Sequence, residues 1–243
     1  MAISNYKDLE PLDLGQCNAV YRATDGDGTP VILKTPRSPP SARLLERFER
    51  EFELTRRAAG PGVVPVLRLE IHDDAPVLVF EDGGGRPLDT LLDKRRLSVT
   101  EALEIAIGVA KALRDIHALM VAHKDVNPSN LLLDANTGSV RLFDFGIATG
   151  LSREQPTLRN IRELEGTLHY MSPEQTGRMN RPLDTRTDLY SLGVTLYEML
   201  TGATPFDAED PLELVHAHLA RTALPVHERN SAVPVALSAV AAR

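Results

Sequence analysis

The sequence predicts an α+β chain of two lobes, a small β-rich lobe followed by a larger α-helical lobe. Short strand-like segments separated by turn residues fill the chain up to residue 80, and helical periodicity dominates after residue 98. Three consecutive glycines at 83–85 separate the two patterns. We therefore expect an N-lobe at 1–82, a hinge at 83–87 and a C-lobe at 88–243.

The N-lobe segments read as strands joined by tight turns. Residues 19–22 (AVYR) and 31–34 (VILK) have the residue types of strands, and the DGDG sequence at 25–28 is typical of a turn between them. Two further strands are expected at 63–69 and 76–80. Ser41 can cap a helix that runs to about Ala59. Its apolar positions are Leu44, Leu45, Phe48, Phe52 and Leu54.

Three helices and a final partial helix are expected in the C-lobe. Ser98 and Glu101 form a capping box that opens the first, and a second covers 184–200. Asp210 followed by Pro211 begins the third. Residues 234–243 read as a helix cut short, so we expect the C-lobe to be incomplete at its end. The expected apolar stripe of the first helix is Leu103, Ile107, Ala110, Leu113 and Leu119.

Composition limits the class of protein. The 243 residues are 42% hydrophobic and 25% charged, which is typical of a globular chain, and the net charge of −7 argues against broad nucleic-acid binding. The single Cys17 cannot form an internal disulfide, which fits a reducing cytoplasm. The first residues do not resemble a signal peptide, and no apolar run approaches the roughly 20 residues of a membrane span.

The chemical signal lies in two short segments in the middle of the chain. Residues 123–130 read HKDVNPSN, and DFG follows at 144–146. An Asp, an Asn five residues later and a second Asp are the residue types that can orient a hydroxyl and hold Mg²⁺ on phosphates. Around them lie VILK at 31–34, GT at 166–167, SPE at 172–174 and DLYSLG at 188–193. In this order the segments resemble the protein kinases, which implies a bilobal protein-kinase-like fold.

The resemblance implies a role for each residue that matches a kinase motif, and it implies two cofactors, ATP and Mg²⁺. Asp125 would be the catalytic base, and Asn130 and Asp144 would be the metal ligands. Lys34 would hold the α- and β-phosphates and contribute to catalysis. Glu51 is the expected partner of Lys34, with Glu49 and Glu53 as the alternatives on the same helix.

The nucleotide would lie between the glycine loop and the hinge. Gly15 and Val20 belong to this loop, in which Asp13 and Asn18 stand at two positions that are commonly glycine in kinases. The adenine edge would hydrogen-bond to the backbone near Glu81 and Gly83. Phe80 would lie at the back of the adenine pocket, or else be an ordinary core residue.

Asn127 is the main departure from the kinase pattern, because protein kinases usually have a lysine there. An amide keeps a hydrogen-bond donor but loses the charge, which should slow transfer about tenfold. Thr167 resembles a threonine of Ser/Thr kinases and favours a Ser/Thr acceptor in a protein substrate. Among the hydroxyls of the activation segment at 144–174 are Ser152 and Thr157. His123 is expected to brace the loop, and Asp188 to tether its backbone.

The segment SPEQTGRMNR at 172–181 is similar to bacterial Ser/Thr kinase domains that begin large signalling proteins. In such proteins, ATPase-like and sensor histidine kinase domains follow the kinase domain. Two alternatives remain open from the sequence. Asn127 and the reduced glycine loop also fit a pseudokinase that binds nucleotide or partners. A small-molecule kinase of the aminoglycoside type is the third reading, but the segment at 166–174 and the helix of Asp188 argue against it.

Overall fold

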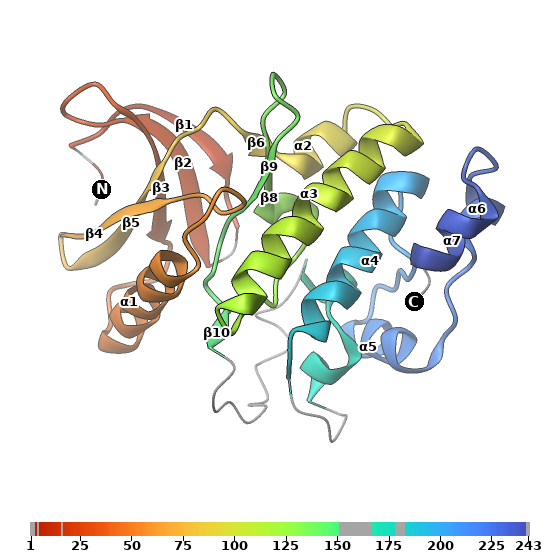
Figure 1. Ribbon diagram of the computed structural model, residues 1–243. Coiled ribbons are helices and arrows are strands. Elements are labelled where there is room, and N and C mark those ends of the chain that lie inside the picture. Colours follow the sequence, from red (N-terminus) through yellow and green to blue (C-terminus); the bar gives the residue numbers. More distant parts are fainter. Residues whose placement is uncertain (1–2, 4, 16, 151–166, 178–182, 242–243) are drawn as a thin grey trace.

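A five-stranded antiparallel sheet, with one helix beside it, forms the β-rich lobe. The computed structural model describes residues 3, 5–15, 17–150, 167–177 and 183–241. The sheet order is β1-β2-β3-β5-β4, and neighbouring strands pair antiparallel. Its strands are β1 (Lys7–Asp13), β2 (Asn18–Thr24), β3 (Pro30–Pro36), β4 (Val66–His72) and β5 (Ala75–Glu81). Figure 1 shows the sheet on the N-terminal side of the molecule.

Helix α1 (Ala42–Arg57) packs beside this sheet, against β4 and β5. It begins where expected, because the Ser41 side chain accepts a hydrogen bond from the Leu44 amide. Leu44 and Phe48 are buried against the sheet, as the apolar pattern predicts. Glu51 and Thr55 are buried on the same face. The amphipathic helix therefore presents a carboxylate to the inside of the lobe.

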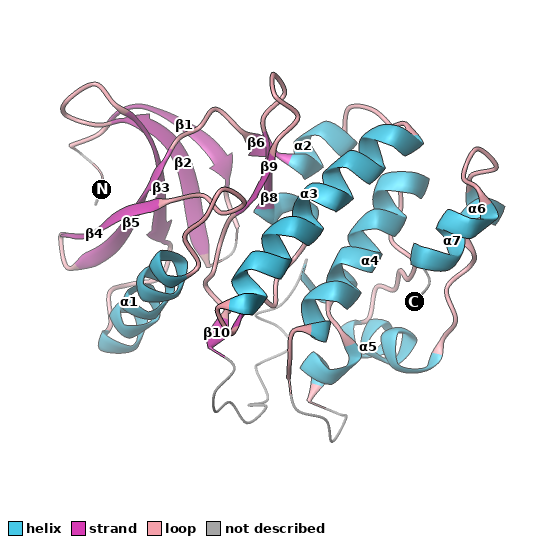
Figure 2. Cartoon of the chain, in the orientation of Figure 1, coloured by secondary structure: helices cyan, strands magenta, loops and turns pink. Residues whose placement is uncertain are grey.

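The second lobe is mainly helical, as Figure 2 shows. The chain enters it through β6 (Arg86–Pro87) and the short helix α2 (Leu88–Leu92). Its centre is α3 (Val99–Ala118), which packs against α4 (Arg186–Thr201). The remaining helices are α5 (Pro211–Ala220), α6 (Val226–Arg229) and α7 (Val235–Ala241). In the described part of the chain, no helix combines the length and apolar character needed to cross a bilayer.

Short strands between α3 and α4 carry the loops that the sequence singled out. They are β7 (Val121–Ala122), β8 (Leu131–Leu133), β9 (Val140–Leu142) and β10 (Thr149–Gly150). β6, β8 and β9 form one small sheet, and β10 pairs with β7. Residues 123–130 therefore lie between β7 and β8, and DFG follows β9 directly.

The structure corrects several details of the sequence reading. Helix α3 begins with the predicted capping box, but of the predicted apolar stripe Leu113 alone is buried. Ile107 and Leu119 are 52% and 42% exposed. The buried residues are Ala102, Ile105, Ala106, Val109, Ala112, Leu113 and Ile116. Because these positions include three alanines, a search for the largest apolar residues selects the wrong face.

Two smaller corrections concern boundaries and short elements. The fourth strand begins at Val66 rather than at residue 63, because Val63 and Val64 contact Leu142 across the lobes instead of pairing with β5. Helices α2 and α6 were not predicted. They have five and four residues, which is too short for a periodicity signal.

Candidate active site

Three segments that are far apart in the sequence bring an ammonium and two carboxylates together. Lys34 on β3 lies 2.8 and 2.9 Å from the two carboxylate oxygens of Glu51 on α1. Its Nζ also lies 2.6 Å from Oδ1 of Asp144, in the loop after β9. Of the three acids considered on α1, only Glu51 is buried, whereas Glu49 and Glu53 are exposed. The helix therefore lies with its buried carboxylate directed into the site.

The ionisable groups of this cluster shift one another's pKa values, although Lys34 and Glu51 are buried. Burial alone would lower the pKa of Lys34, but Asp144 and Glu51 together raise it, so the ammonium stays charged. Burial alone would raise the pKa of Asp144, but the Lys34 ammonium holds it below its usual range. Burial raises the pKa of Glu51 to about 7, with Asp144 adding to the effect and Lys34 opposing it.

A buried aspartate holds the backbone at the start of the loop at 123–130. Asp188, near the start of α4, is fully buried and accepts hydrogen bonds from the His123 amide at 2.9 Å and the Lys124 amide at 2.6 Å. The predicted tether is confirmed. His123 is also fully buried, with Nε2 3.0 Å from the Phe143 carbonyl oxygen and its ring against Phe145. These contacts give the loop one conformation.

Two asparagines hold Asp125 from the same side of the loop. Nδ2 of Asn127 donates to Oδ1 of Asp125 at 2.7 Å, and Nδ2 of Asn130 donates to the Asp125 carbonyl at 2.9 Å. The amide oxygen of Asn127 accepts from the backbone amides of Ser129 and Asn130, at 3.0 and 3.3 Å. Asn127 is thus the cap of the short 3₁₀ turn Pro128–Asn130 and also orients Asp125.

The surroundings of Asp125 favour a group that can accept a proton near neutral pH. Burial and then the negative charge of Asp144 raise the pKa of Asp125 to about 7, while the hydrogen bonds from Asn127 and Asn130 oppose the rise. A divalent cation beside Asp144 would cancel the contribution of that carboxylate. The position is therefore suited to general-base work.

Asn130 and Asp144 offer oxygens of the kind that Mg²⁺ prefers. Because Nδ2 of Asn130 is used by the Asp125 carbonyl, its Oδ1 is the atom that remains for a cation. Asp144 has the positive φ of 64° that a loop needs for a sharp turn, and its Oδ1 accepts from the Gly146 amide at 2.9 Å. No group of three acidic, histidine or cysteine side chains that could hold a metal occurs among the described residues. Two oxygen ligands completed by phosphates are the usual arrangement for Mg²⁺.

The N-lobe side of the site is formed by the end of β1 and the start of β2. Gly15 lies in the connection between them, and Val20 is buried in the same core cluster as Phe80 and Phe143. Phe80 is 1% exposed and packs edge-on against Phe143, so it has the contacts of a core residue. Burial raises the pKa of Asp13, with Asp89 and Asp144 adding to the effect.

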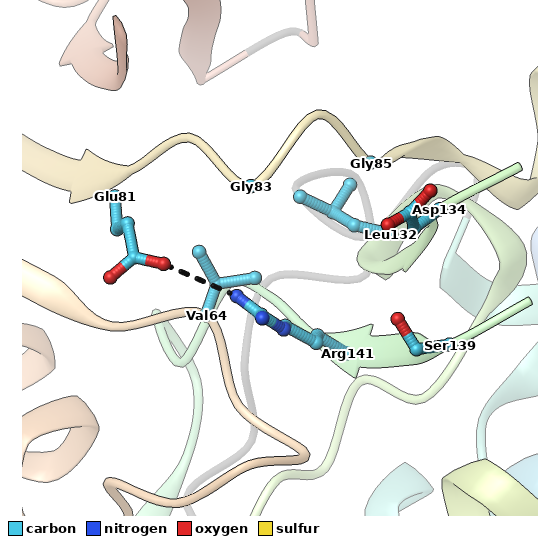
Figure 3. A pocket seen from close by; sticks show the side chains of 8 residues that line it. All are labelled: Val64, Glu81, Gly83, Gly85, Leu132, Asp134, Ser139 and Arg141. Carbon is cyan, nitrogen blue, oxygen red and sulfur yellow. Dashed lines mark hydrogen bonds and ion pairs between the residues drawn. The ribbon is translucent and has the colours of Figure 1, made fainter. Parts of the chain in front are cut away.

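The hinge borders a small cavity, which Figure 3 shows. Glu81, Gly83 and Gly85 line it from the hinge, and Arg141 of β9 reaches Glu81 at 3.5 Å. The remaining lining residues are Val64, Leu132, Asp134 and Ser139. A Cβ at Gly83 would lie 3.1 Å from the Arg141 guanidinium. The glycine at this position lets the hinge and the β8–β9 hairpin approach closely.

Some site contacts had no recognisable sequence signal. The Ser129 hydroxyl donates to Asp89 of α2 at 2.7 Å, and Arg22 of β2 contacts Asp82, the residue that precedes the hinge. Neither pair has a characteristic spacing, so only the fold could reveal them. The activation-segment hydroxyls Ser152 and Thr157, and the side chain of Thr167, lie outside what the structure describes.

Comparisons with known proteins agree with this geometry. The sequence model of the protein kinase domain matches residues 6–238. A probable serine/threonine-protein kinase of Clostridium perfringens is 37% identical over 80% of this chain and 28% of its own length. The DNA damage-responsive serine/threonine-protein kinase RqkA of Deinococcus radiodurans is 34% identical over 97% of this chain and 35% of its length. The chain thus spans about a third of the curated relatives it matches.

Proposed function

The chain belongs to the protein kinase family, and on that premise we propose that it transfers the γ-phosphate of ATP to Ser or Thr hydroxyls of protein substrates. The observation that supports this most directly is the contact of Lys34 with both Glu51 and Asp144. Kinases need this ion pair and the metal-binding aspartate in place before transfer can occur. The relatives that carry this domain are named serine/threonine-protein kinases, which favours the Ser/Thr acceptor.

In the proposed reaction, Asp125 accepts a hydrogen bond from the substrate hydroxyl and takes up its proton as the hydroxyl oxygen bonds to the γ-phosphorus of ATP. The bond between the γ-phosphorus and the β–γ bridging oxygen breaks, and ADP is the leaving group. Asn127 keeps the Asp125 carboxylate in place through the 2.7 Å contact. Lys34, held by Glu51, directs its ammonium to the phosphates. Gly15 and Val20 cover the nucleotide, and the backbone of Glu81 and Gly83 meets the adenine edge. Oriented groups of this kind supply most of the catalysis in phosphoryl transfer.

The proposed metal ligands are Asn130 and Asp144, for a divalent cation such as Mg²⁺. When bound, the cation neutralises negative charge on the phosphates as the transfer proceeds. Asp144 keeps its charge because Lys34 lowers its pKa, so a carboxylate is ready for the cation at neutral pH. The short bond from Lys34 to Asp144 supports a site in which phosphates, metal and ammonium meet.

We also propose the wider context of the domain. The N-lobe is residues 1–82, the hinge 83–87 and the C-lobe 88–243, in a cytoplasmic bacterial signalling protein. The 172–181 segment supports a protein in which ATPase-like and sensor histidine kinase domains accompany the kinase. Sequencing of the gene that encodes the chain tests this proposal. An open reading frame that encodes neither domain would remove it.

The activity itself is tested by transfer of labelled γ-phosphate from ATP to a generic protein substrate and to the chain. We expect transfer by the wild type in Mg²⁺, a loss of about 100-fold or more in Asp125→Ala, and none after chelation of the metal. A melting-temperature increase with ATP that requires Mg²⁺ tests binding separately. Metal-dependent binding without transfer by the folded wild type would overturn the proposed catalysis and leave a nucleotide-binding module.

A further inference from the structure

A single arginine connects the N-lobe sheet to both ends of the glycine hinge. Nε of Arg22 on β2 donates to Oδ2 of Asp82 at 2.5 Å, and Nη2 donates to Oδ1 of Asp82 at 3.1 Å. The same Nη2 donates to the carbonyl oxygen of Gly85 at 2.7 Å. Asp82 directly precedes the three glycines and Gly85 is the last of them. The guanidinium therefore spans the hinge on one side.

This contact is shielded from solvent, unlike most ion pairs of the surface. The side chain of Asp82 is 4% exposed and that of Arg22 is 18% exposed. Oδ1 of Asp82 also accepts from the Gly84 amide at 2.8 Å, which fixes the turn at Gly84 with its φ of 79°. Bidentate arginine–carboxylate pairs have both strength and a fixed geometry. Their contribution to the free energy of unfolding exceeds that of exposed pairs, for which this contribution is often small.

The hinge needs such a restraint because its sequence is unusually flexible. Glycine loses more conformational freedom on ordering than any other residue, and three occur in succession. At Gly85 the approach is close, because a Cβ there would lie 3.2 Å from the Cβ of Leu132 and this neighbour would have to shift slightly. Packing therefore favours a glycine at this position, and the backbone needs a restraint from elsewhere.

Two other charged contacts at the hinge are more exposed. Arg86, within the hinge, pairs with Glu10 of β1 at 3.1 Å, and these two side chains are 56% and 47% exposed. Arg141 reaches Glu81 at 3.5 Å, and the two side chains are 36% and 50% exposed (Figure 3). The contact between Arg141 and Glu81 also lies before the three glycines in the chain, since Glu81 is the last residue of β5. Arg22 is consequently the side chain that restrains the hinge from Asp82 to Gly85.

We propose that Arg22 is a positioning residue for nucleotide binding, which holds the hinge backbone in the shape that meets the adenine base. This inference rests on the proposed function, because it takes the hinge as the adenine site. If the binding-competent hinge becomes only fractionally populated, the apparent affinity falls by that fraction. The cluster of Lys34, Glu51 and Asp144 is not in contact with Arg22, so turnover at saturating ATP should stay the same.

The test measures the Kd of Mg²⁺–ADP by calorimetry, and the KM for ATP and kcat, in Arg22→Ala, Asp82→Ala and the double variant. We expect Kd and KM to rise about five- to tenfold in Arg22→Ala, with kcat within about twofold of the wild type. The loss of affinity in the double variant should be smaller than the sum of the two single losses, because both single changes remove the same Arg22–Asp82 contact, while each also removes one contact to the hinge backbone. Arg22→Lys should lie between wild type and Arg22→Ala, since lysine lacks the planar fork.

The matched control is Arg221→Ala, which removes an exposed arginine paired with Glu213 at 2.9 Å in the C-lobe. It should leave Kd unchanged. Amide exchange provides a readout apart from activity, with faster exchange at Gly83–Gly85 expected in Arg22→Ala while α3 stays protected. If Arg22→Ala does not fold, Arg22→Gln takes its place.

The outcomes separate the inference from the proposed function. A folded wild type that does not bind Mg²⁺–ADP would overturn the proposed function. Wild-type binding with equal binding by Arg22→Ala would overturn the inference alone. Additive effects of the two single changes, or a fall in kcat without a change in KM, would also overturn it.

Discussion

Asn127 provides the sharpest test of how the catalytic loop works. Its amide nitrogen donates to the carboxylate of Asp125, and its amide oxygen accepts from the amides of Ser129 and Asn130. Asn127→Ala removes these three bonds and a longer one, from the amide nitrogen to the Asp125 carbonyl at 3.3 Å. A hydrogen bond to a charged group contributes about 1.5–3 kcal/mol, and each 1.4 kcal/mol of barrier is a factor of ten. We therefore expect kcat to fall about 10- to 100-fold, with the KM for ATP within about twofold.

Stability should fall as well, because Asn127 is the cap of the 3₁₀ turn. Loss of such a cap costs about 0.5–2 kcal/mol, and a domain of this size loses about 2–4 °C per kcal/mol. Radiometric transfer and thermal melting measure the two effects. Ser129→Ala is the matched control in the same loop, since the Ser129 side chain is exposed and bonds to Asp89 rather than Asp125. Its kcat should stay within about twofold.

Asn127→Lys tests the effect of a positive charge at this position separately from the effect of the hydrogen bonds that the Asn127 amide oxygen accepts. The lysine places an ammonium where negative charge develops, and such electrostatic help is often the largest catalytic contribution. It cannot accept from the two backbone amides, so the melting temperature should fall as in Asn127→Ala while turnover is kept or raised. Equal kcat in the wild type and Asn127→Ala, with Asp125→Ala inactive, would refute the assigned role of Asn127.

Three further predictions use other parts of the fold. Lys34→Met leaves the buried Glu51 without its partner and should cost about 3–5 kcal/mol, seen as a melting-temperature loss of at least about 6 °C, whereas Glu49→Gln should have little effect. Gly62→Ala should destabilise by about 1–3 kcal/mol in urea unfolding, because its Cβ would lie 2.4 Å from that of Ala112. Gly60→Ala is the control, since the nearest atom to a Cβ there is 3.9 Å away, and equal destabilisation by the two variants would contradict the packing argument. Arg95 and Ser98 lower the pKa of Glu101 to about 2, so its contribution to stability is present above the unfolded-state pKa of about 4.5 and is lost as the pH falls towards 2. The melting-temperature difference between wild type and Glu101→Gln should consequently be smaller at pH 3.5 than at pH 7.

Local sequence signals were sufficient to predict features that involve a single short segment. Ser41, Ser98 with Glu101, and Asp210 cap their helices as their sequence positions indicate, because a cap joins residues two or three apart. The family resemblance also selected Lys34, Asp125, Asn130 and Asp144. The structure brings these four residues into one site, although their roles in binding and transfer stay predictions.

Tertiary structure decided the contacts between segments that are distant in the chain. On α1, Glu49, Glu51 and Glu53 occupy alternate positions, and only the packing of the helix against β4 and β5 selects Glu51 for Lys34. On α3, the small residues at 102, 106 and 112 face the core while the larger Ile107 faces solvent. Helix packing depends on how closely two backbones approach, which the size of single residues does not reveal.

The sequence by itself therefore determined the family, the order of the elements and the residue types of the site. It predicted a donor at Asn127 but could not say whether the amide faces a phosphate or Asp125. It gave no sign that Arg22 spans the hinge, because that contact joins residues about 60 positions apart. Such pairings depend on the register of β2 with β3 and of β3 with β5, and register is set by the whole sheet.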